Sequence, residues 1–195
     1  MKKILCSLIT VIMLTSSLSV SAENKFTDVN TGDWYYETVT EMTEKGLFEG
    51  KGDNLFCPDD TMTVAEFITV VVRALYPDED ITPKAGQKWW QGAYEVAVFN
   101  RLMDYSEIIE LDISYLSGSN DQTIILDIPV LRQVMAMISV RALKVLGETD
   151  IQSYESDLIP DYSRVGTYYR DYVCKAYGAG IIVGDENGNF NPRNT

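Results

Sequence analysis

The 195-residue sequence contains no histidine and far fewer basic than acidic residues. Without histidine, the chain cannot form a serine–histidine or cysteine–histidine catalytic pair, nor a histidine-based metal site. The 16 basic and 29 acidic residues give a formal net charge of −13, which disfavours nucleic acid and anionic membrane surfaces as partners. A carboxylate pair for glycoside hydrolysis stays open among so many acids, but no such pair stands out. We therefore expect no enzyme activity, no catalytic residue, no cofactor and no metal site.

Long apolar runs are missing after the first 22 residues. In residues 1–22, Met1 is followed by Lys2 and Lys3, then by an apolar stretch from Ile4 to Leu14, and the segment ends in Val20-Ser21-Ala22. This pattern is typical of a cleaved signal peptide, and an uncleaved N-terminal anchor is the alternative. The apolar stretch is too short to span a membrane. We expect an exported protein with no membrane span, whose acidic surface keeps it in solution.

Cysteine is scarce as well. Only Cys57 and Cys174 follow the predicted signal peptide, because Cys6 lies inside it. Export would permit a disulfide between them, but their positions give no geometric reason to expect one. Two buried thiols are the default expectation.

Glycine, phenylalanine and proline recur at fixed spacing. Four positions of the first copy reappear after an offset of 134 residues: Gly46, Gly50, Phe56 and Pro58 match Gly180, Gly184, Phe190 and Pro192. A glycine such as Gly46 can take the left-handed conformation that ends a helix. Thr63, followed three residues later by Glu66, is a capping box that begins another helix. The sequence therefore predicts a mostly α-helical chain built from helix–turn–helix repeats.

The first repeat spans residues 26–76. Its first helix is expected over Trp34–Lys45, where Tyr35, Val39 and Met42 share one face. Its second helix is expected to run from Thr63 through Leu75.

The second repeat spans residues 84–146 and departs from this pattern. Arg73-Ala74-Leu75 and Arg141-Ala142-Leu143 align at an offset of 68 residues, whereas Arg101 replaces the glycine that ends the first helix. An insert at about 104–127 takes the place of the Phe-x-Pro corner, and we expect a small β-hairpin or an irregular excursion there.

The third repeat spans residues 158–195, and Tyr168-Tyr169 stand where the tryptophans of the other repeats stood. The sequence stops at Thr195, where a second helix should begin, so we expect that it is truncated and that further domains lie beyond. The run Asp185–Asn189 suggests a calcium loop. However, it lacks the glycine and the glutamate that an EF-hand requires, so we expect a turn.

The order Phe-x-Asp, Trp, Gly, Gly, Phe-x-Pro, Thr-x-Ala-Glu-Phe resembles the S-layer homology repeat over Phe26–Thr195. The resemblance implies a pseudo-threefold helical bundle and a non-enzymatic module at the cell wall or S-layer surface. Its implied partner is an acidic secondary cell-wall polysaccharide, or a glycan linked to peptidoglycan. In that family the ligand contacts come from the arginine of a Thr-Arg-Ala-Glu motif, from glycine backbone groups and from tryptophans.

Carried onto this chain, the motif reads Thr63-Val64-Ala65-Glu66 in the first repeat and Leu131-Arg132-Gln133-Val134 in the second. Arg132 is the only arginine at the family's ligand position. The implied polysaccharide-binding residues are Arg132, Trp34, Trp89, Gly50 and Gly184.

Each of these residues also has a simpler interpretation. The two tryptophans could anchor the core, the glycines could serve backbone shape, and Arg132 could be an ordinary half-solvated side chain. Thr63 and Glu66 are expected to cap a helix. The alternative function is a surface scaffold or protein–protein assembly module, which would not depend on Arg132.

Overall fold

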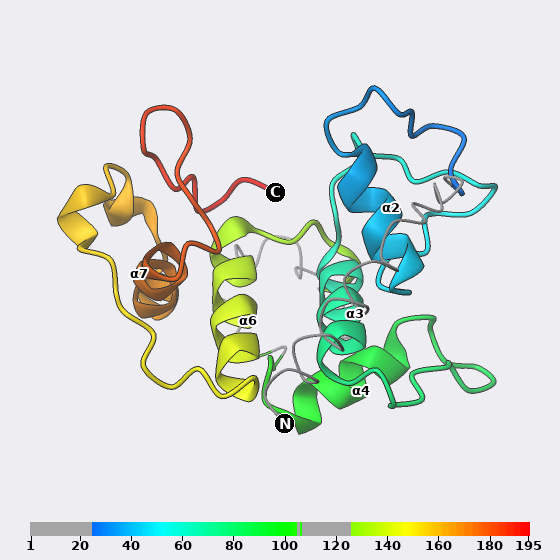
Figure 1. The fold of residues 1–195 in the computed structure, drawn as a ribbon. Helices are drawn as coiled ribbons and strands as arrows, with labels where there is room; N and C mark the ends of the chain where they lie inside the picture. The colour runs from blue at the N-terminus through cyan, green and yellow to red at the C-terminus, as the bar shows by residue number, and fades with distance from the viewer. Residues whose placement is uncertain (1–24, 105, 107–125) are drawn as a thin grey trace, which may run out of the picture. The chain divides into compact units, whose positions relative to one another are not determined.

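The computed structural model describes residues 25–104, 106 and 126–195, which are mostly helical as predicted (Figure 1). The predicted signal peptide and nearly all of the predicted insert, including its hairpin, lie outside the described residues. In the described ranges there is no strand, only the isolated bridges Gly52–Leu55 and Thr63–Pro129. No helix in these ranges is both long and apolar enough to cross a membrane. The chain divides into two compact units, residues 1–58 and 59–195.

In the described part of the first unit, residues 25–58, the one helix is α2 (Tyr36–Glu44), which lies inside the expected range. A small core forms where Phe26, Val29 and Val39 are buried together. Tyr35, Tyr36 and Phe56 pack against that core as partly buried side chains.

The second unit holds α3 (Val64–Leu75), α4 (Gln91–Phe99), α6 (Arg132–Val145) and α7 (Arg170–Gly178). Three short 3₁₀ turns precede α7: η3 (Ser156–Leu158), η4 (Tyr162–Arg164) and η5 (Thr167–Tyr169). α3 and α6 lie side by side, α4 packs against α3, and α7 packs against α6 (Figure 1). In the first and second repeats, the second helix thus packs on the first helix of the following repeat.

Because of this packing, the boundary between the compact units does not coincide with a boundary between repeats. The boundary after Pro58 falls inside the predicted repeat 26–76, because α3 joins the core of the second unit. Val64, Ile68 and Val72 of α3 are buried there. Helix α3 therefore belongs to one repeat by sequence and to another compact unit by packing.

The prediction that Trp34 and Trp89 anchor the core is wrong. Trp34 is 91% exposed and Trp89 is 53% exposed. The following aromatic residue fills the core instead: Trp90 is 3% exposed and Tyr169 is fully buried. The indole N–H of Trp90 donates to Asp127 Oδ1 at 3.0 Å, so its one polar atom is satisfied.

The N-termini of α3 and α6 differ in their side-chain capping but make the same kind of backbone contact. Thr63 is the N-cap of α3, and its capping box with Glu66 is complete. Leu131 is the N-cap of α6 and makes no side-chain cap. In both helices the first amide donates at 2.9 Å to a carbonyl of the next repeat: Val64 N–H to Ile128 and Arg132 N–H to Asn194. These bonds satisfy donors that a helix leaves unpaired.

The first helix of every repeat ends in one left-handed residue. This residue is Gly46 (φ 70°), Arg101 (φ 57°) or Gly180 (φ 67°). The amide that follows it donates five residues back: Leu47 to Met42, Leu102 to Ala97 and Ile181 to Ala176. Arg101 thus ends α4 with the same geometry as the glycines, at a conformational cost that glycine does not have.

Arg101→Gly should therefore stabilise the protein. Relief of the left-handed strain, about 1–2 kcal/mol, exceeds the extra unfolded-chain entropy of glycine, about 0.4–1 kcal/mol. We expect the free energy of unfolding in urea to rise by about 0.5–1 kcal/mol. Gly180→Ala is the matched control: its Cβ meets nothing within 4 Å, so the conformation alone should cost about 1 kcal/mol. An unchanged or lower stability of Arg101→Gly would contradict the expectation.

Candidate functional site

A carboxylate holds the turn that ends the third repeat. Asp161 Oδ1 accepts from the backbone N–H of Phe190 at 2.7 Å, and Oδ2 accepts from that of Asn191 at 2.8 Å. Asp161 is only 7% exposed, and Asn191 is left-handed with φ 55°. Two charge-assisted hydrogen bonds therefore fix two consecutive amides in a conformation that a non-glycine residue seldom adopts.

The first repeat carries the same clamp. Asp28 Oδ1 accepts from Phe56 N–H at 2.9 Å, and Oδ2 accepts from Cys57 N–H at 2.7 Å. Cys57 is left-handed like Asn191, with φ 58°. The Phe56 amide is the largest influence on the pKa of Asp28 and holds it below its ordinary value of 3.8; burial opposes this effect, and the Cys57 amide adds a further lowering. The aspartate of the Phe-x-Asp motif therefore has a structural role that the sequence pattern did not predict.

Two of the predicted site residues, Gly50 and Gly184, shape these turns. A Cβ on Gly50 would lie 2.5 Å from Leu55 O, and one on Gly184 would lie 2.7 Å from the carbonyl carbon of Gly188. The close approach lets Lys51 N–H reach Leu55 O and Asp185 N–H reach Asn189 O. Any larger residue would force the two limbs of the turn apart, so backbone shape alone requires glycine here.

The Asp185–Asn189 run is a turn, as predicted. The Asp185 carboxylate accepts from the amides of Asn187 and Asn189 and from Asn191 Nδ2. The Asn191 side chain and then the Asn189 amide hold the pKa of Asp185 below its ordinary value. Among the described residues, no group of three or more acidic, cysteine or histidine side chains could hold a metal ion.

Arg132 lies against the turn of the third repeat. Its Nε donates to Phe190 O at 2.7 Å, its Nη2 donates to Val183 O at 2.9 Å, and its guanidinium lies 5.3 Å from the centre of the Phe190 ring. Val183 directly precedes Gly184, so the structure places two of the predicted site residues, Arg132 and Gly184, next to each other. Within the described ranges these contacts are all to neutral groups, and Nη1 makes none. The half-buried guanidinium is held in place with one nitrogen unused.

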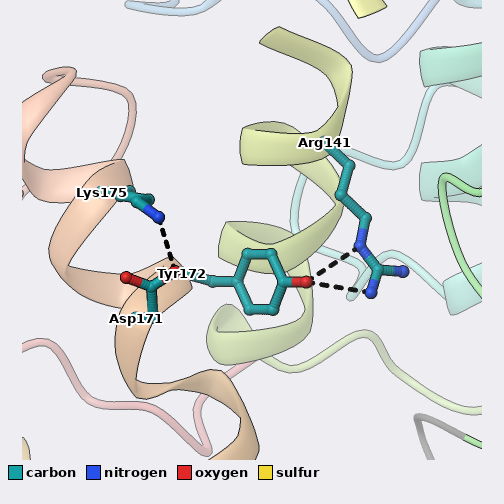
Figure 2. A network of polar contacts seen from close by, with 4 residues as sticks. All are labelled: Arg141, Asp171, Tyr172 and Lys175. Atoms are coloured by element: carbon teal, nitrogen blue, oxygen red, sulfur yellow. Dashed lines mark hydrogen bonds and ion pairs between the residues drawn. The ribbon is translucent and has the colours of Figure 1, made fainter. Parts of the chain in front are cut away.

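Arg141, on the same helix, has different surroundings. Its Nε and Nη2 donate to Tyr172 OH at 3.3 and 3.0 Å, and its guanidinium lies 5.2 Å from that ring's centre (Figure 2). Nη2 also donates to Tyr168 OH at 3.0 Å. Lys175 forms an ion pair with Asp171 beside it (Figure 2). Arg141 therefore joins α6 to α7, a role that the repeat pattern did not reveal.

In the second unit, no contact among the described residues joins Trp89 to Arg132. Trp89 directly precedes the α4 N-cap in the second unit, with half of its surface exposed. Trp34 and Gly50 lie in the first unit, where Trp34 packs edge-on against Tyr35 at 5.4 Å. Cys57 and Cys174 are both free thiols, and Cys57 is only half-buried, contrary to the expectation of two buried ones.

The fold and its two clamped turns define an α-helical repeat protein. The S-layer homology domain matches residues 25–68 and 158–195, so the chain contains S-layer homology repeats. This family assignment indicates a location at the cell surface, and a surface-layer relative agrees with it.

Three relatives are similar to the chain. An endoglucanase of Bacillus sp. (strain KSM-635) is 26% identical over 93% of this chain and 18% of its own length. An amylopullulanase of Thermoanaerobacterium thermosulfurigenes is 25% identical over 88% of this chain and 9% of its own. The surface-layer 125 kDa protein of Lysinibacillus sphaericus is 30% identical over 49% of this chain and 9% of its own. The chain spans less than a fifth of the length of each relative.

The clamp of the first repeat should respond to acid. Folding lowers the pKa of the Asp28 carboxyl, so the ionised group stabilises the folded state at pH values above its ordinary pKa of 3.8. This stabilisation is lost as the pH falls through the pKa of the folded state. In an NMR titration, the Asp28 carboxyl carbon should titrate below pH 3.8, together with the Phe56 and Cys57 amide protons. Asp28→Asn should abolish this titration of the two amides. A midpoint at or above 3.8 would contradict the clamp.

Proposed function

We propose that this chain attaches non-covalently to the bacterial cell wall by binding an acidic secondary cell-wall polysaccharide, and that it does so without catalysis. Arg132 carries the proposal: two carbonyl oxygens hold its guanidinium, no carboxylate contacts it among the described residues, and Nη1 is unused. Membership of the S-layer homology family supports attachment at the cell surface in general.

The surroundings of Arg132 suit an anionic sugar. A guanidinium presents planar N–H donors that match a carboxylate, and carbonyl partners orient it without cancelling its charge. Because Arg132 is half-buried and fixed by two hydrogen bonds, it loses little side-chain entropy on binding. The net charge of −13 repels an anionic polymer at long range, so a local contact of this kind must supply the attraction.

Exposed aromatic faces support the same proposal. Trp34 and Trp89 occupy one repeat position and are 91% and 53% exposed, although large aromatic side chains are usually buried. A flat indole face offers apolar contact to the C–H surface of a sugar ring. The two tryptophans therefore provide sugar-contact surface that is not needed for the core.

Removal of the Arg132 guanidinium should weaken cell-wall binding. We would co-sediment the chain with purified bacterial sacculi that carry or lack the secondary polysaccharide. Loss of a charge-assisted pair should lower the affinity of Arg132→Ala by about tenfold or more. Arg132→Lys keeps the charge but loses the planar fork, so its affinity should lie between those of Arg132→Ala and the unmodified chain.

Arg164→Ala is the matched control, because it removes the same charge from an exposed arginine of the same unit. Its binding should stay within about twofold of the original. Circular dichroism and thermal melting of each variant separate lost binding from lost folding. A folded, unmodified chain that stays in the supernatant would overturn polysaccharide binding and favour the assembly alternative.

A further inference from the structure

We propose that Asp161 is a positioning residue for Arg132, acting through the peptide unit that joins Phe190 to Asn191. This inference rests on the proposed function, because it assigns to a buried acid the task of orienting the ligand-binding arginine. Asp161 lies 29 residues from the turn in sequence and is 7% exposed, so it is not itself placed to meet a polymer.

The geometry is a chain of three groups. Asp161 Oδ2 accepts from Asn191 N–H at 2.8 Å, and Phe190 O accepts from Arg132 Nε at 2.7 Å. The Asn191 N–H and the Phe190 C=O belong to one planar peptide unit, so the orientation of one fixes the orientation of the other. A hydrogen bond at the N–H end also polarises the carbonyl at the opposite end. Asp161 thus sets both the direction and the strength of the acceptor that holds Arg132.

A second bond from Asp161 prevents the peptide unit from turning. Asp161 Oδ1 accepts from Phe190 N–H at 2.7 Å, which fixes the preceding peptide unit too. Asn191 is left-handed at φ 55°, a conformation that costs a non-glycine residue free energy and that the clamp offsets. Without Asp161, the Phe190 carbonyl would be free to rotate away from Arg132 Nε.

The first repeat provides an internal control. Asp28 makes the same two bonds to Phe56 and Cys57. The first unit contains no arginine that could play the part of Arg132 beside the Phe56 carbonyl. Asp28→Asn therefore loosens an equivalent turn and removes an equal charge without disturbing an arginine.

An electrostatic role and a positioning role of Asp161 predict opposite changes in polymer affinity when its carboxylate is removed. Removing a carboxylate near the site reduces repulsion of an anionic polymer, so a purely electrostatic role predicts tighter binding. A positioning role predicts weaker binding, because Arg132 loses its oriented acceptor. Asp161→Glu keeps the charge and displaces the carboxylate by one methylene, so it should also weaken binding.

The test uses the full chain and the two kinds of sacculi. We expect Asp161→Asn and Asp161→Glu to lower the affinity for polysaccharide-bearing sacculi by about fivefold to tenfold, the scale of one ordinary hydrogen bond, because Arg132 keeps its charge and loses only its oriented acceptor. Asp28→Asn should leave the affinity unchanged or slightly higher. Far-ultraviolet circular dichroism and melting confirm that each variant is folded. If Asp161→Asn does not fold, Asp161→Glu carries the test.

A second readout needs no ligand. Hydrogen exchange of the Arg132 Nε proton, followed by NMR, should be about fivefold to tenfold faster in Asp161→Asn and unchanged in Asp28→Asn. Faster exchange in a chain that does not bind sacculi would retain the positioning role and reject the proposed function. Unchanged exchange, or tighter binding of Asp161→Asn, would overturn the positioning role.

Discussion

The turns of this protein depend on one interaction, a carboxylate that accepts from two consecutive backbone amides. Asp28 and Asp161 each make this pair of bonds, at 2.7–2.9 Å, to a phenylalanine amide and to the left-handed residue that follows. A left-handed residue other than glycine is unfavourable by itself, and buried amides need partners. A single charged acceptor meets both requirements, which explains why an acid so distant in sequence belongs to the turn.

Arg132 depends on this turn in a further way. Its guanidinium donates from Nε and Nη2 to the Phe190 and Val183 carbonyls, and Nη1 has no partner in the part of the chain that the structure describes. The Arg132 side chain therefore links α6 to the turn by hydrogen bonds and also holds a positive charge in a fixed position beside that turn. An acidic chain can retain an acidic polymer only through such local contacts, because its long-range field is repulsive. Arg141 shows the contrast, since its guanidinium donates from all three nitrogens, to phenol oxygens and to a carbonyl.

The helices bury their apolar faces across repeat boundaries. α3 packs on α4, and α6 packs on α7, so each repeat completes the core of its neighbour. The helix N-termini follow the same rule, because the first amides of α3 and α6 donate to carbonyls of the following repeat. This sharing explains why α3 joins the second compact unit although its sequence belongs to the first repeat. A helix pair of this size cannot bury its apolar surface alone.

The sequence by itself determined the local features. Helix bounds, the Thr63–Glu66 capping box and the glycine-ended helices follow from residues within a few positions of one another, and such preferences act at short range. The resemblance to the S-layer homology repeat also singled out Arg132 and Gly184, although not the contact of Arg132 with the turn that contains Gly184.

Only the tertiary structure decided the rest. It buried Trp90 and left Trp89 exposed. It also joined Asp161 to Arg132 through one peptide unit. Each of these outcomes depends on which side chains and amides meet across tens of residues, and short-range preferences carry no information about those meetings.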